Sequence, residues 1–251
     1  MIDTRQLAKN GIRLLDMHSH TKLSDGSQTF QESINFAKKK GFGLCITDHN
    51  EIKGSLQIPK DLFTLYSSEI TSSDYLDLLL YFSSQKSISE FYNKYIINNR
   101  IKEFGFKFYR TKLSTLELIE HAKDFNALTI VAHPYAPYPK KSFNFFNKNK
   151  NLIKKVDGVE GLNGMMSYKS NKLALFWAKE NNLPITAGSD AHTLKYAGST
   201  LTACYANSKE EFIEQIRKGK SMVYSEQINS FDRHLQSAHI LLKNIKLFWI
   251  Y

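Results

Sequence analysis

The sequence predicts an α/β fold of parallel strands and helices, organised as one domain over residues 1–251. Strand-like apolar runs alternate with amphipathic helical runs, which is the pattern of βα units. A chain of 251 residues with 42% hydrophobic residues is long enough to build a barrel of this class around one core. Histidine or carboxylate side chains follow five of the predicted strands, as expected where strand ends form a site.

The first half of the chain combines four predicted strands with one clearly delimited helix. The helix over residues 30–40 begins after Thr29, has Glu32 at capping-box spacing, and ends at Gly41. Apolar and β-branched runs bounded by polar residues predict the strands. These strands are expected at residues 12–18, 42–47, 62–70 and 75–82.

The second half continues the alternation and raises the expected number of strands to seven. Ser114 and Ser208 each precede a glutamate by three residues, which is a helix start signal. Helices are expected at residues 87–104, 116–125, 171–180 and 208–218, and strands at 128–132, 156–160 and 184–187. The core motifs lie within residues 12–205, and residues 206–251 are predicted to form a C-terminal helix and tail.

The formal net charge of +10 has two interpretations, which both stay open. Positive charge attracts phosphorylated partners, including nucleic acid. However, the excess comes almost entirely from lysine, with six arginines in the chain, and specific phosphate recognition favours the arginine fork. An AT-rich coding bias enriches Lys, Asn, Ile, Phe and Tyr together, and it explains the charge without a function.

Cysteine usage and hydropathy predict a cytoplasmic protein that does not enter a membrane. Cys45 and Cys204 lie in separate apolar runs, and both are predicted to be small buried strand residues. No stretch reaches the roughly 18 uninterrupted apolar residues that a membrane helix needs. The first residues lack the basic-then-apolar order of a signal peptide.

Residues 134–155 form a basic, irregular segment without any acidic residue. Three prolines at its start are followed by six lysines. The segment is either a basic lid over a phosphate site or a solvated surface loop with a short helix.

Five predicted strand ends carry side chains that bind metals. His18 and His20 are two residues apart, so they share one strand face, and Asp190 and His192 repeat this spacing. Because parallel strand ends share one mouth of a barrel, these groups are expected to converge. Imidazole and carboxylate suit zinc, manganese and iron, and the set exceeds the needs of one ion. The other candidates are Asp25, His49, Glu69 and His133, whereas surface positions are expected for His121, His234 and His239.

Together these motifs resemble the polymerase and histidinol phosphatase (PHP) superfamily. The order His-x-His, Asp-Gly, Thr-Asp-His, Glu, His-Pro and Gly-Ser-Asp-Ala-His extends from Asp16 to Tyr205. Residues 157–163 also resemble the strand before the last motif of the family. The resemblance implies a distorted (β/α)7 TIM-like barrel, with two or three divalent ions (Mn, Fe or Zn) at the C-terminal ends of the strands.

The resemblance also implies how the ligands are shared. His18, His20, Glu69 and Asp190 would hold one ion, and Glu69 would bridge to a second ion bound by His133. The third ion would be held by Asp25, His49 and His192. Asp77 stands where the family usually has another histidine, and it is either a ligand of the second ion or a surface residue.

The expected function is a metal-dependent phosphoesterase that hydrolyses phosphate mono- or diesters of a small metabolite or nucleotide through a metal-activated water. The sequence shows no arrangement that predicts a covalent nucleophile. Lys195 and Arg110 are candidate phosphate contacts or ordinary surface cations. Two alternatives stay open: a nuclease that trims nucleic acid ends, and a non-catalytic metal-binding PHP module. The sequence predicts no oligomeric state.

Overall fold

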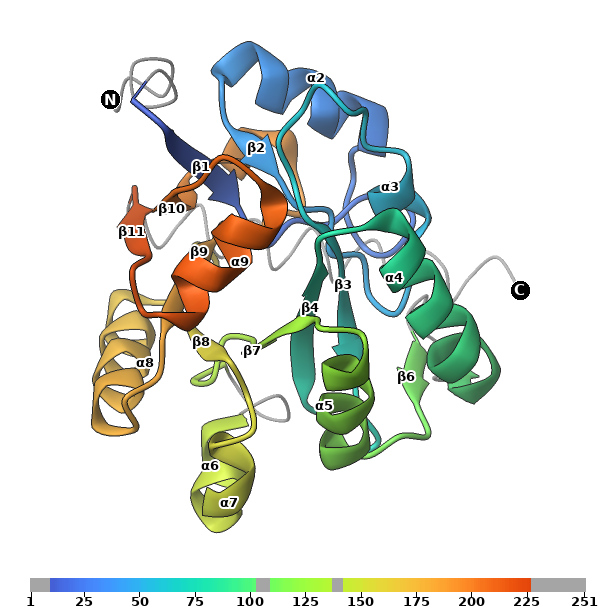
Figure 1. Cartoon of the computed structure of the whole chain (residues 1–251), viewed down its shortest axis with the longest axis vertical. Helices are drawn as coiled ribbons and strands as arrows, with labels where there is room; N and C mark the ends of the chain where they lie inside the picture. The colour runs from blue at the N-terminus through green and yellow to red at the C-terminus, as the bar shows by residue number, and fades with distance from the viewer. Residues whose placement is uncertain (1–9, 103–108, 137–141, 227–251) are drawn as a thin grey trace.

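The structure is a computed structural model that describes residues 10–102, 109–136 and 142–226 (Figure 1). It is a mixed α/β fold with two larger sheets and one two-stranded hairpin. The first sheet has the order β11-β10-β1-β2, in which β1 and β2 are parallel and the other pairs are antiparallel. Its strands are β1 (Ile12–Asp16), β2 (Gly43–Leu44), β10 (Thr200–Tyr205) and β11 (Met222–Ser225).

The second sheet has the order β3-β4-β7-β8-β9 and contains one strand of reversed direction. Its strands are β3 (Tyr66–Thr71), β4 (Asp77–Phe82), β7 (Leu128–Val131), β8 (Gly158–Asn163) and β9 (Ile185–Gly188). The expectation that all strands run in parallel is wrong for β4, which is antiparallel to both β3 and β7. The reason is physical: residues 72–76 are too few for the crossover of about a dozen residues that parallel strands need.

The reversal of β4 decides where Asp77 lies. Asp77 begins β4 and pairs with Thr71, which ends β3. Asp77 is therefore at the same edge of the sheet as the carboxyl ends of β3 and β7. It is 1% exposed, so the interpretation of Asp77 as a surface residue is wrong.

Backbone hydrogen bonds join the two larger sheets beyond the ends of the named strands. His20 N–H donates to Ala191 O (3.0 Å), within a parallel bridge between the segments that follow β1 and β9. Glu69 N–H donates to Thr47 O (3.2 Å), within a second parallel bridge that connects the segment after β2 to β3.

The predicted capping boxes are present at two helices. Thr29 and Glu32 cap α2 (Phe30–Lys40), which ends at Gly41 in the left-handed conformation (φ 79°). Ser114 and Glu117 cap α5 (Thr115–Asp124) in the same way, and the side chain of Ser208 caps α9 (Lys209–Arg217). The other α-helices of the described residues are α3 (Lys53–Leu56), α4 (Gln85–Phe91), α6 (Ser142–Lys148), α7 (Lys150–Ile153) and α8 (Tyr168–Glu180).

The prediction of one helix over residues 87–104 holds only as far as Asn99, and the regular α-helix ends at Phe91. A π-helical turn (Tyr92–Ile96) and a 3-10 turn (Ile97–Asn99) follow α4, and then β5 (Arg100–Lys102) pairs with β6 (Tyr109–Thr111). The Asn99 side chain donates to Tyr95 O (2.8 Å), and such local side-chain bonds compete with the regular helix pattern.

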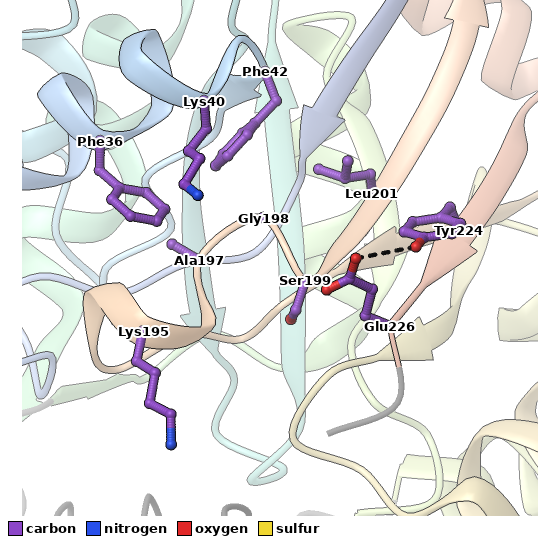
Figure 2. Close-up of a pocket in the computed structure, with 10 residues that line it drawn as sticks. All are labelled: Phe36, Lys40, Phe42, Lys195, Ala197, Gly198, Ser199, Leu201, Tyr224 and Glu226. Atoms are coloured by element: carbon purple, nitrogen blue, oxygen red, sulfur yellow. Dashed lines mark hydrogen bonds between the residues drawn. The ribbon is translucent and has the colours of Figure 1, made fainter. Parts of the chain in front are cut away.

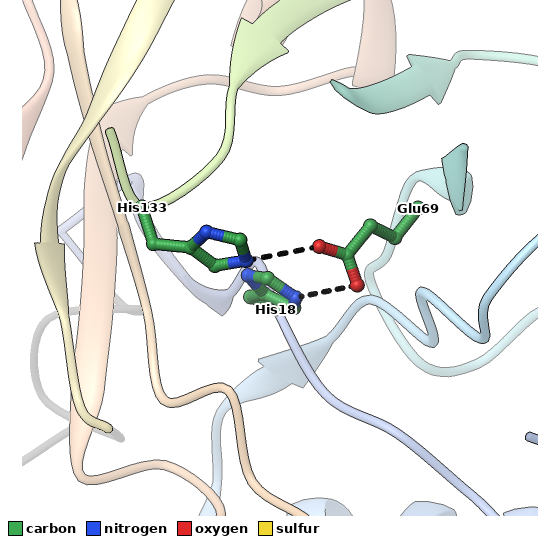
Figure 3. A group of neighbouring side chains, drawn as sticks. All are labelled: His18, Glu69 and His133. Carbon is green, nitrogen blue, oxygen red and sulfur yellow. Dashed lines mark hydrogen bonds and ion pairs between the residues drawn. The ribbon is translucent and has the colours of Figure 1, made fainter. Parts of the chain in front are cut away.

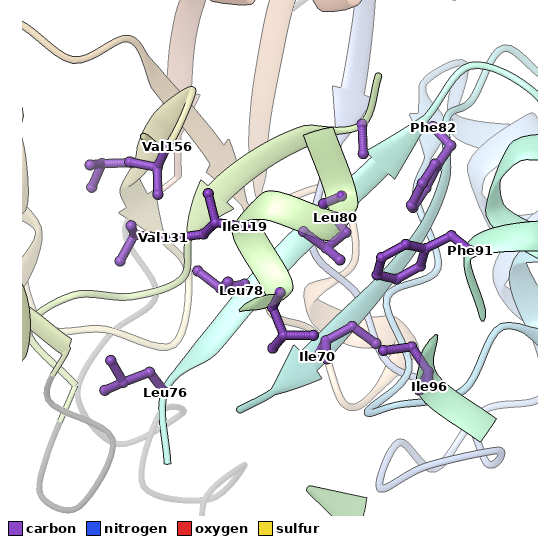
Figure 4. Packing of buried hydrophobic residues seen from close by; sticks show 14 of the residues in the cluster. Ile70, Leu76, Leu78, Leu80, Phe82, Phe91, Ile96, Ile119, Val131 and Val156 are labelled. Atoms are coloured by element: carbon purple, nitrogen blue, oxygen red, sulfur yellow. The ribbon is translucent and has the colours of Figure 1, made fainter. Parts of the chain in front are cut away.

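The strands bury side chains on both faces. Leu78, Leu80 and Phe82 of β4 face α4 and α5, where they pack against Phe91 and Ile119 (Figure 4). The alternate residues Leu79 and Tyr81 pack in a second cluster with Leu15, Met17 and Ile130. Each fully buried side chain of this kind contributes about 1.5–3 kcal/mol to stability.

The predictions for the two cysteines and for the basic segment are confirmed only in part. Cys45 and Cys204 are both buried and unbonded to one another; Cys204 lies in β10, whereas Cys45 follows β2. In the basic segment, α6 packs Phe146 into the core and Lys155 pairs with Glu120 (2.6 Å). Residues 137–141, which the lid prediction includes, lie outside the described residues, so the lid stays a prediction. None of the described helices combines the length and apolar character needed to cross a membrane.

Candidate metal centre

The eight residues predicted from the five strand ends lie together in the structure. We call these eight residues the metal centre: His18, His20, Asp25, His49, Glu69, His133, Asp190 and His192. None is more than 7% exposed. The backbone after β1, β7 and β9 and the end of β3 bring six of them together, while His49 and Asp25 come from loops.

Four donor atoms of the metal centre form a compact set around one point. His20 Nε2 lies 3.1 Å from both His18 Nε2 and Asp190 Oδ1, and His18 Nε2 lies 3.5 Å from Asp190 Oδ1. Glu69 Oε2 is 3.4 Å from both imidazole nitrogens. Ligand atoms about 2.1 Å from one ion are separated by roughly 3.0–3.4 Å at octahedral to tetrahedral angles. The four donors therefore fit one divalent ion.

Glu69 directs its two carboxylate oxygens toward different histidines (Figure 3). Oε1 lies 3.1 Å from His133 Nε2, and Oε2 faces His18 Nε2 at 3.4 Å. Asp77 Oδ2 is 3.9 Å from the same nitrogen of His133. Thr71 Oγ1 donates to Asp77 Oδ1 (2.6 Å), which leaves Oδ2 as the oxygen on the His133 side.

A further set of donors surrounds Asp25. Asp25 Oδ2 lies 3.2 Å from His192 Nε2 and 3.6 Å from His49 Nε2, and Oδ1 lies 3.5 Å from His20 Nδ1. The ring of His20 stacks on those of His49 and His192, with centroids 4.7 and 4.4 Å apart. Three stacked imidazoles whose nitrogens converge suit a bound cation better than three separate protonated rings do.

The electrostatics of the metal centre favour ionised carboxylates. Burial raises the pKa of Asp25, but His192, His49 and His20 outweigh it and hold that pKa well below its usual range. Glu69 shows the same balance, with His49 and His18 as the main opposing groups to burial, so its pKa is also well below its usual range. Burial lowers the pKa of His192, yet the Asp25 carboxylate raises it to about 9. Burial and the neighbouring His192 lower the pKa of His20.

Two further buried carboxylates hold the backbone of the metal centre, and sequence reasoning assigned no role to them. Asp16 accepts hydrogen bonds from Ser189 N–H (2.8 Å) and Oγ (2.6 Å), which fixes the turn before Asp190. Burial raises the pKa of Asp16 to about 6. Asp48 accepts from Thr21 N–H (2.7 Å) and Ser24 Oγ (2.6 Å), next to Asp25. Their positions within Asp-x-His and Thr-Asp-His could have indicated this supporting role.

The two predicted phosphate contacts lie in different surroundings. Arg110 of β6 places its guanidinium 4.8 Å from the ring centre of Tyr75, in the turn that precedes Asp77. Lys195 lines a cavity of about 250 Å³ with Phe36, Phe42 and Tyr224, and its side chain extends away from these rings (Figure 2). Its contact with substrate stays a prediction, as does that of Arg110.

The histidines outside the metal centre are placed only in part. His121 lies on α5 and stacks on Tyr95 with ring centres 3.8 Å apart, away from the eight residues. His234 and His239 lie outside the described residues.

Comparison with known proteins identifies the family. A model of the PHP domain matches residues 16–155, which is more than half of the chain, and a model described as PHP-associated matches residues 169–221. The chain belongs to the PHP family. This is the family that the motifs between Asp16 and Tyr205 resemble.

Solved structures support the PHP fold at low sequence identity. The lesion-specific endonuclease of Pyrococcus furiosus matches with a TM-score of 0.62 and 17% identity, over 84% of this chain and 57% of the endonuclease. An Endonuclease Q complex with a 27-mer duplex carrying an abasic lesion matches with a TM-score of 0.65 and 19% identity, over 85% of this chain and 58% of that protein. This chain thus spans less than two thirds of the length of these endonucleases.

A two-domain protein of Bacteroides vulgatus, described as containing a predicted PHP-like metal-dependent phosphoesterase, matches with a TM-score of 0.57 and 16% identity. The match covers 94% of this chain and 69% of that protein. No curated protein matches the chain in sequence.

Proposed function

We propose that this PHP protein hydrolyses phosphate mono- or diesters of a small metabolite or a nucleotide. The observation that carries the proposal is the set of four buried donors on His18, His20, Glu69 and Asp190, with mutual distances of 3.1–3.5 Å. Two imidazoles and two carboxylates at this spacing form a divalent-ion site. Its neighbours in the metal centre extend the site beyond one ion.

The distances between donor atoms support the ligand sets that the resemblance to the PHP family implies. His18, His20, Glu69 and Asp190 would hold one ion, and Asp25, His49 and His192 would hold another. Glu69, His133 and Asp77 would hold a further ion near the end of β7. Divalent ions bound there would stabilise charge on phosphate oxygens and acidify water. Carboxylate-rich sites favour harder ions, so Asp77 supports manganese or iron over zinc at the His133 site.

The side chains of the metal centre would orient the ions and balance their charge. The buried histidines present ring nitrogens toward a shared point, and carboxylates face them from β3, the Asp25 loop and the end of β9. Arg110 and Lys195 would contact phosphate oxygens at the edge of the centre.

We also propose that the two larger sheets form one distorted barrel of seven strands. The bridges after β1 and β9 and between β2 and β3 support this proposal, because they connect both larger sheets at two separate places. The ring would run through β1, β2, β3, β4, β7, β8 and β9, within a single domain. A cytoplasmic location is part of the same proposal.

A nuclease is the second candidate function. Tyr75 is 46% exposed and carries the Arg110 guanidinium over its ring, next to the strand that begins with Asp77. Exposed aromatic rings and arginines stack on nucleic acid bases. The fold similarity to the two endonuclease structures supports the same candidate.

One experiment tests these proposals together. Protein purified without chelator is analysed for bound metal and then assayed on an aryl phosphate, nucleoside monophosphates and single-stranded oligonucleotides. Hydrolysis of the small esters supports the phosphoesterase. Release of mononucleotides from oligonucleotides, with binding that weakens as salt rises, supports the nuclease. Metal-loaded protein that cleaves none of the three classes contradicts both and supports the non-catalytic metal-binding module.

A further inference from the structure

Glu160 is a buried carboxylate of β8 that contacts ligands of two proposed ion sites. It is 1% exposed and lies outside the eight residues of the metal centre. Oε1 is 2.9 Å from His18 Nδ1. Oε2 accepts hydrogen bonds from the backbone N–H of His133 (2.8 Å) and from Asn163 Nδ2 (2.9 Å). One carboxylate therefore connects the segments that follow β1 and β7.

The first of these contacts selects the form of the His18 ring. A glutamate side chain that already accepts two N–H bonds on Oε2 favours the His18 tautomer with a proton on Nδ1, directed at Oε1. The lone pair of a neutral ring is then on Nε2, which faces His20, Glu69 and Asp190. A metal-ligating histidine is commonly oriented by a carboxylate on its other nitrogen in this way.

The second contact holds a strained backbone. His133 has φ of 23°, a value that non-glycine residues rarely adopt. Such a conformation costs on the order of 1–3 kcal/mol and persists where its surroundings fix it. The hydrogen bond from His133 N–H to Glu160 is a direct restraint on this residue.

Asn163 extends the same network to Asp190. Its Nδ2 donates to Glu160 Oε2 (2.9 Å) and to Asp190 Oδ2 (3.1 Å), and Asp190 also has a positive φ of 52°. Met165 N–H donates to Asn163 Oδ1 (2.8 Å), which fixes the amide with its nitrogen toward the two carboxylates.

We propose that Glu160, supported by Asn163, is a positioning residue that sets the tautomer of His18 and the backbone of His133, and so couples two ion sites. This inference rests on the proposed metal-dependent function. Glu160 acts on the metal through His18 and His133 and touches neither ion nor substrate.

The test is Glu160→Gln, which keeps size and shape but has one acceptor oxygen in place of two. The amide nitrogen of Gln must then face either His18 Nδ1 or the two N–H donors of His133 and Asn163, so one contact is lost. We expect zinc affinity, measured by calorimetry, to fall about 10–100-fold. Equal zinc affinity of the variant and the wild type would overturn the inference.

A second readout uses the unaltered protein. In zinc-loaded wild type, nitrogen NMR of His18 is expected to show a protonated Nδ1 and a metal-bound Nε2. A proton on Nε2, or zinc on Nδ1, contradicts the inference even if Glu160→Gln fails to fold. If the wild type binds no divalent ion, the proposed function fails, and that result is distinct from a wild type that binds zinc through the wrong nitrogen.

Asp157→Asn is the matched control. Asp157 also leads into β8 and accepts hydrogen bonds from Arg217 Nε (3.1 Å) and Thr129 N–H (2.8 Å), but it contacts no residue of the metal centre in the described part of the chain. We expect this variant to lose thermal stability and keep the zinc affinity of the wild type. If it lost as much affinity as Glu160→Gln, the effect would be one of strand stability, and positioning would be rejected.

Discussion

The two sides of the metal centre differ in how many candidate donor atoms lie close together. On the side of β1 and β9, which we call the dense side, His18, His20 and Asp190 converge with Glu69 at 3.1–3.5 Å. On the side of β4 and β7, the sparse side, His133 has Glu69 at 3.1 Å and Asp77 at 3.9 Å.

This difference suggests that the two sides have different roles, one in binding an ion firmly and the other in the reaction. Closed coordination by protein is typical of ions that are held firmly, whereas catalytic ions keep an open position for water or substrate. The sparse side is therefore where we expect a phosphate oxygen to enter, and the dense side is where we expect the tightest ion.

Replacing His18 on the dense side should have the largest effect. His18→Ala removes a donor that faces both Asp190 and Glu69, so the dense-side ion should be lost. We expect a loss of about 4 kcal/mol of transition-state stabilisation, or roughly 10³-fold in kcat/KM. Metal analysis and steady-state kinetics on the best substrate measure it. His121→Ala, a histidine outside the metal centre, is the control, and unchanged turnover of His18→Ala contradicts the ligand assignment.

In metal-free protein, the free energy of unfolding should depend on pH because of His192, which follows β9 on the dense side. The pKa of His192 is raised from 6.5 to about 9, because the Asp25 carboxylate outweighs burial. The folded state thus binds its proton more tightly than the unfolded state. This contribution, on the order of 3 kcal/mol, is fully present below pH 6.5 and is lost as pH rises through 9. Urea unfolding in chelator at pH 6 to 9 measures it.

The His192→Ala variant should flatten this pH dependence. In metal-loaded wild type the trend should reverse, because an ion displaces the proton and binds more tightly as pH rises. An unfolding free energy of metal-free wild type that increases between pH 6.5 and 9 contradicts the prediction.

On the sparse side, Asp77→Asn should weaken the binding of one metal equivalent and leave the others. The amide keeps an oxygen for the hydrogen bond from Thr71 but lacks the charge. We expect about a 10–100-fold loss of affinity at that site, the range seen when groups around a metal are altered. Calorimetric titration with manganese resolves the equivalents. Asp77→His should shift preference toward zinc, and identical isotherms for all three proteins would remove Asp77 from the site.

The smallest effect concerns the approach of substrate. Arg110 lies beside the turn that leads to Asp77, and Lys195 follows His192, so they mark the sparse and dense sides. A lost hydrogen bond to a charged phosphate corresponds to about 1.5–3 kcal/mol, so the matching glutamine variant should raise KM about tenfold or more. Comparing Arg110→Gln with Lys195→Gln shows which side the phosphate reaches. A KM unchanged in both variants rejects both contacts.

Local patterns in the sequence predicted the starts of helices and the eight residues that the structure brings together. The Ser/Thr-x-x-Glu signals work because a capping box involves residues three apart. The Nε2 atoms of His18 and His20 are 3.1 Å apart, as their spacing of two residues predicts, although β1 ends at Asp16 and both residues lie after it. The rule that strand ends share one mouth predicted the convergence of the six residues at β1, β3, β7 and β9, whereas Asp25 and His49 come from loops. The assignment of each residue to an ion stays a prediction.

Non-local features were less accessible. The short link of residues 72–76 requires β4 to run antiparallel to β3. Runs of apolar residues alone do not indicate the direction of a strand. Glu160 could not be given a role, because its partners His18 and His133 are 142 and 27 residues away in sequence. The end of the helical turns at Asn99 coincides with a hydrogen bond from the Asn99 side chain to Tyr95 O, which periodicity does not register.

The contact between His18 and Asp190 has a consequence for the chain as a polymer. A cation shared by these residues is a reversible cross-link that closes a loop of more than 170 residues. Cross-links that close long loops restrict the unfolded ensemble most, by roughly 4–5 kcal/mol in the simplest chain-entropy account for loops of 100 residues or more. The ion would thus tie the early and late parts of the chain together, and its loss would release them at once.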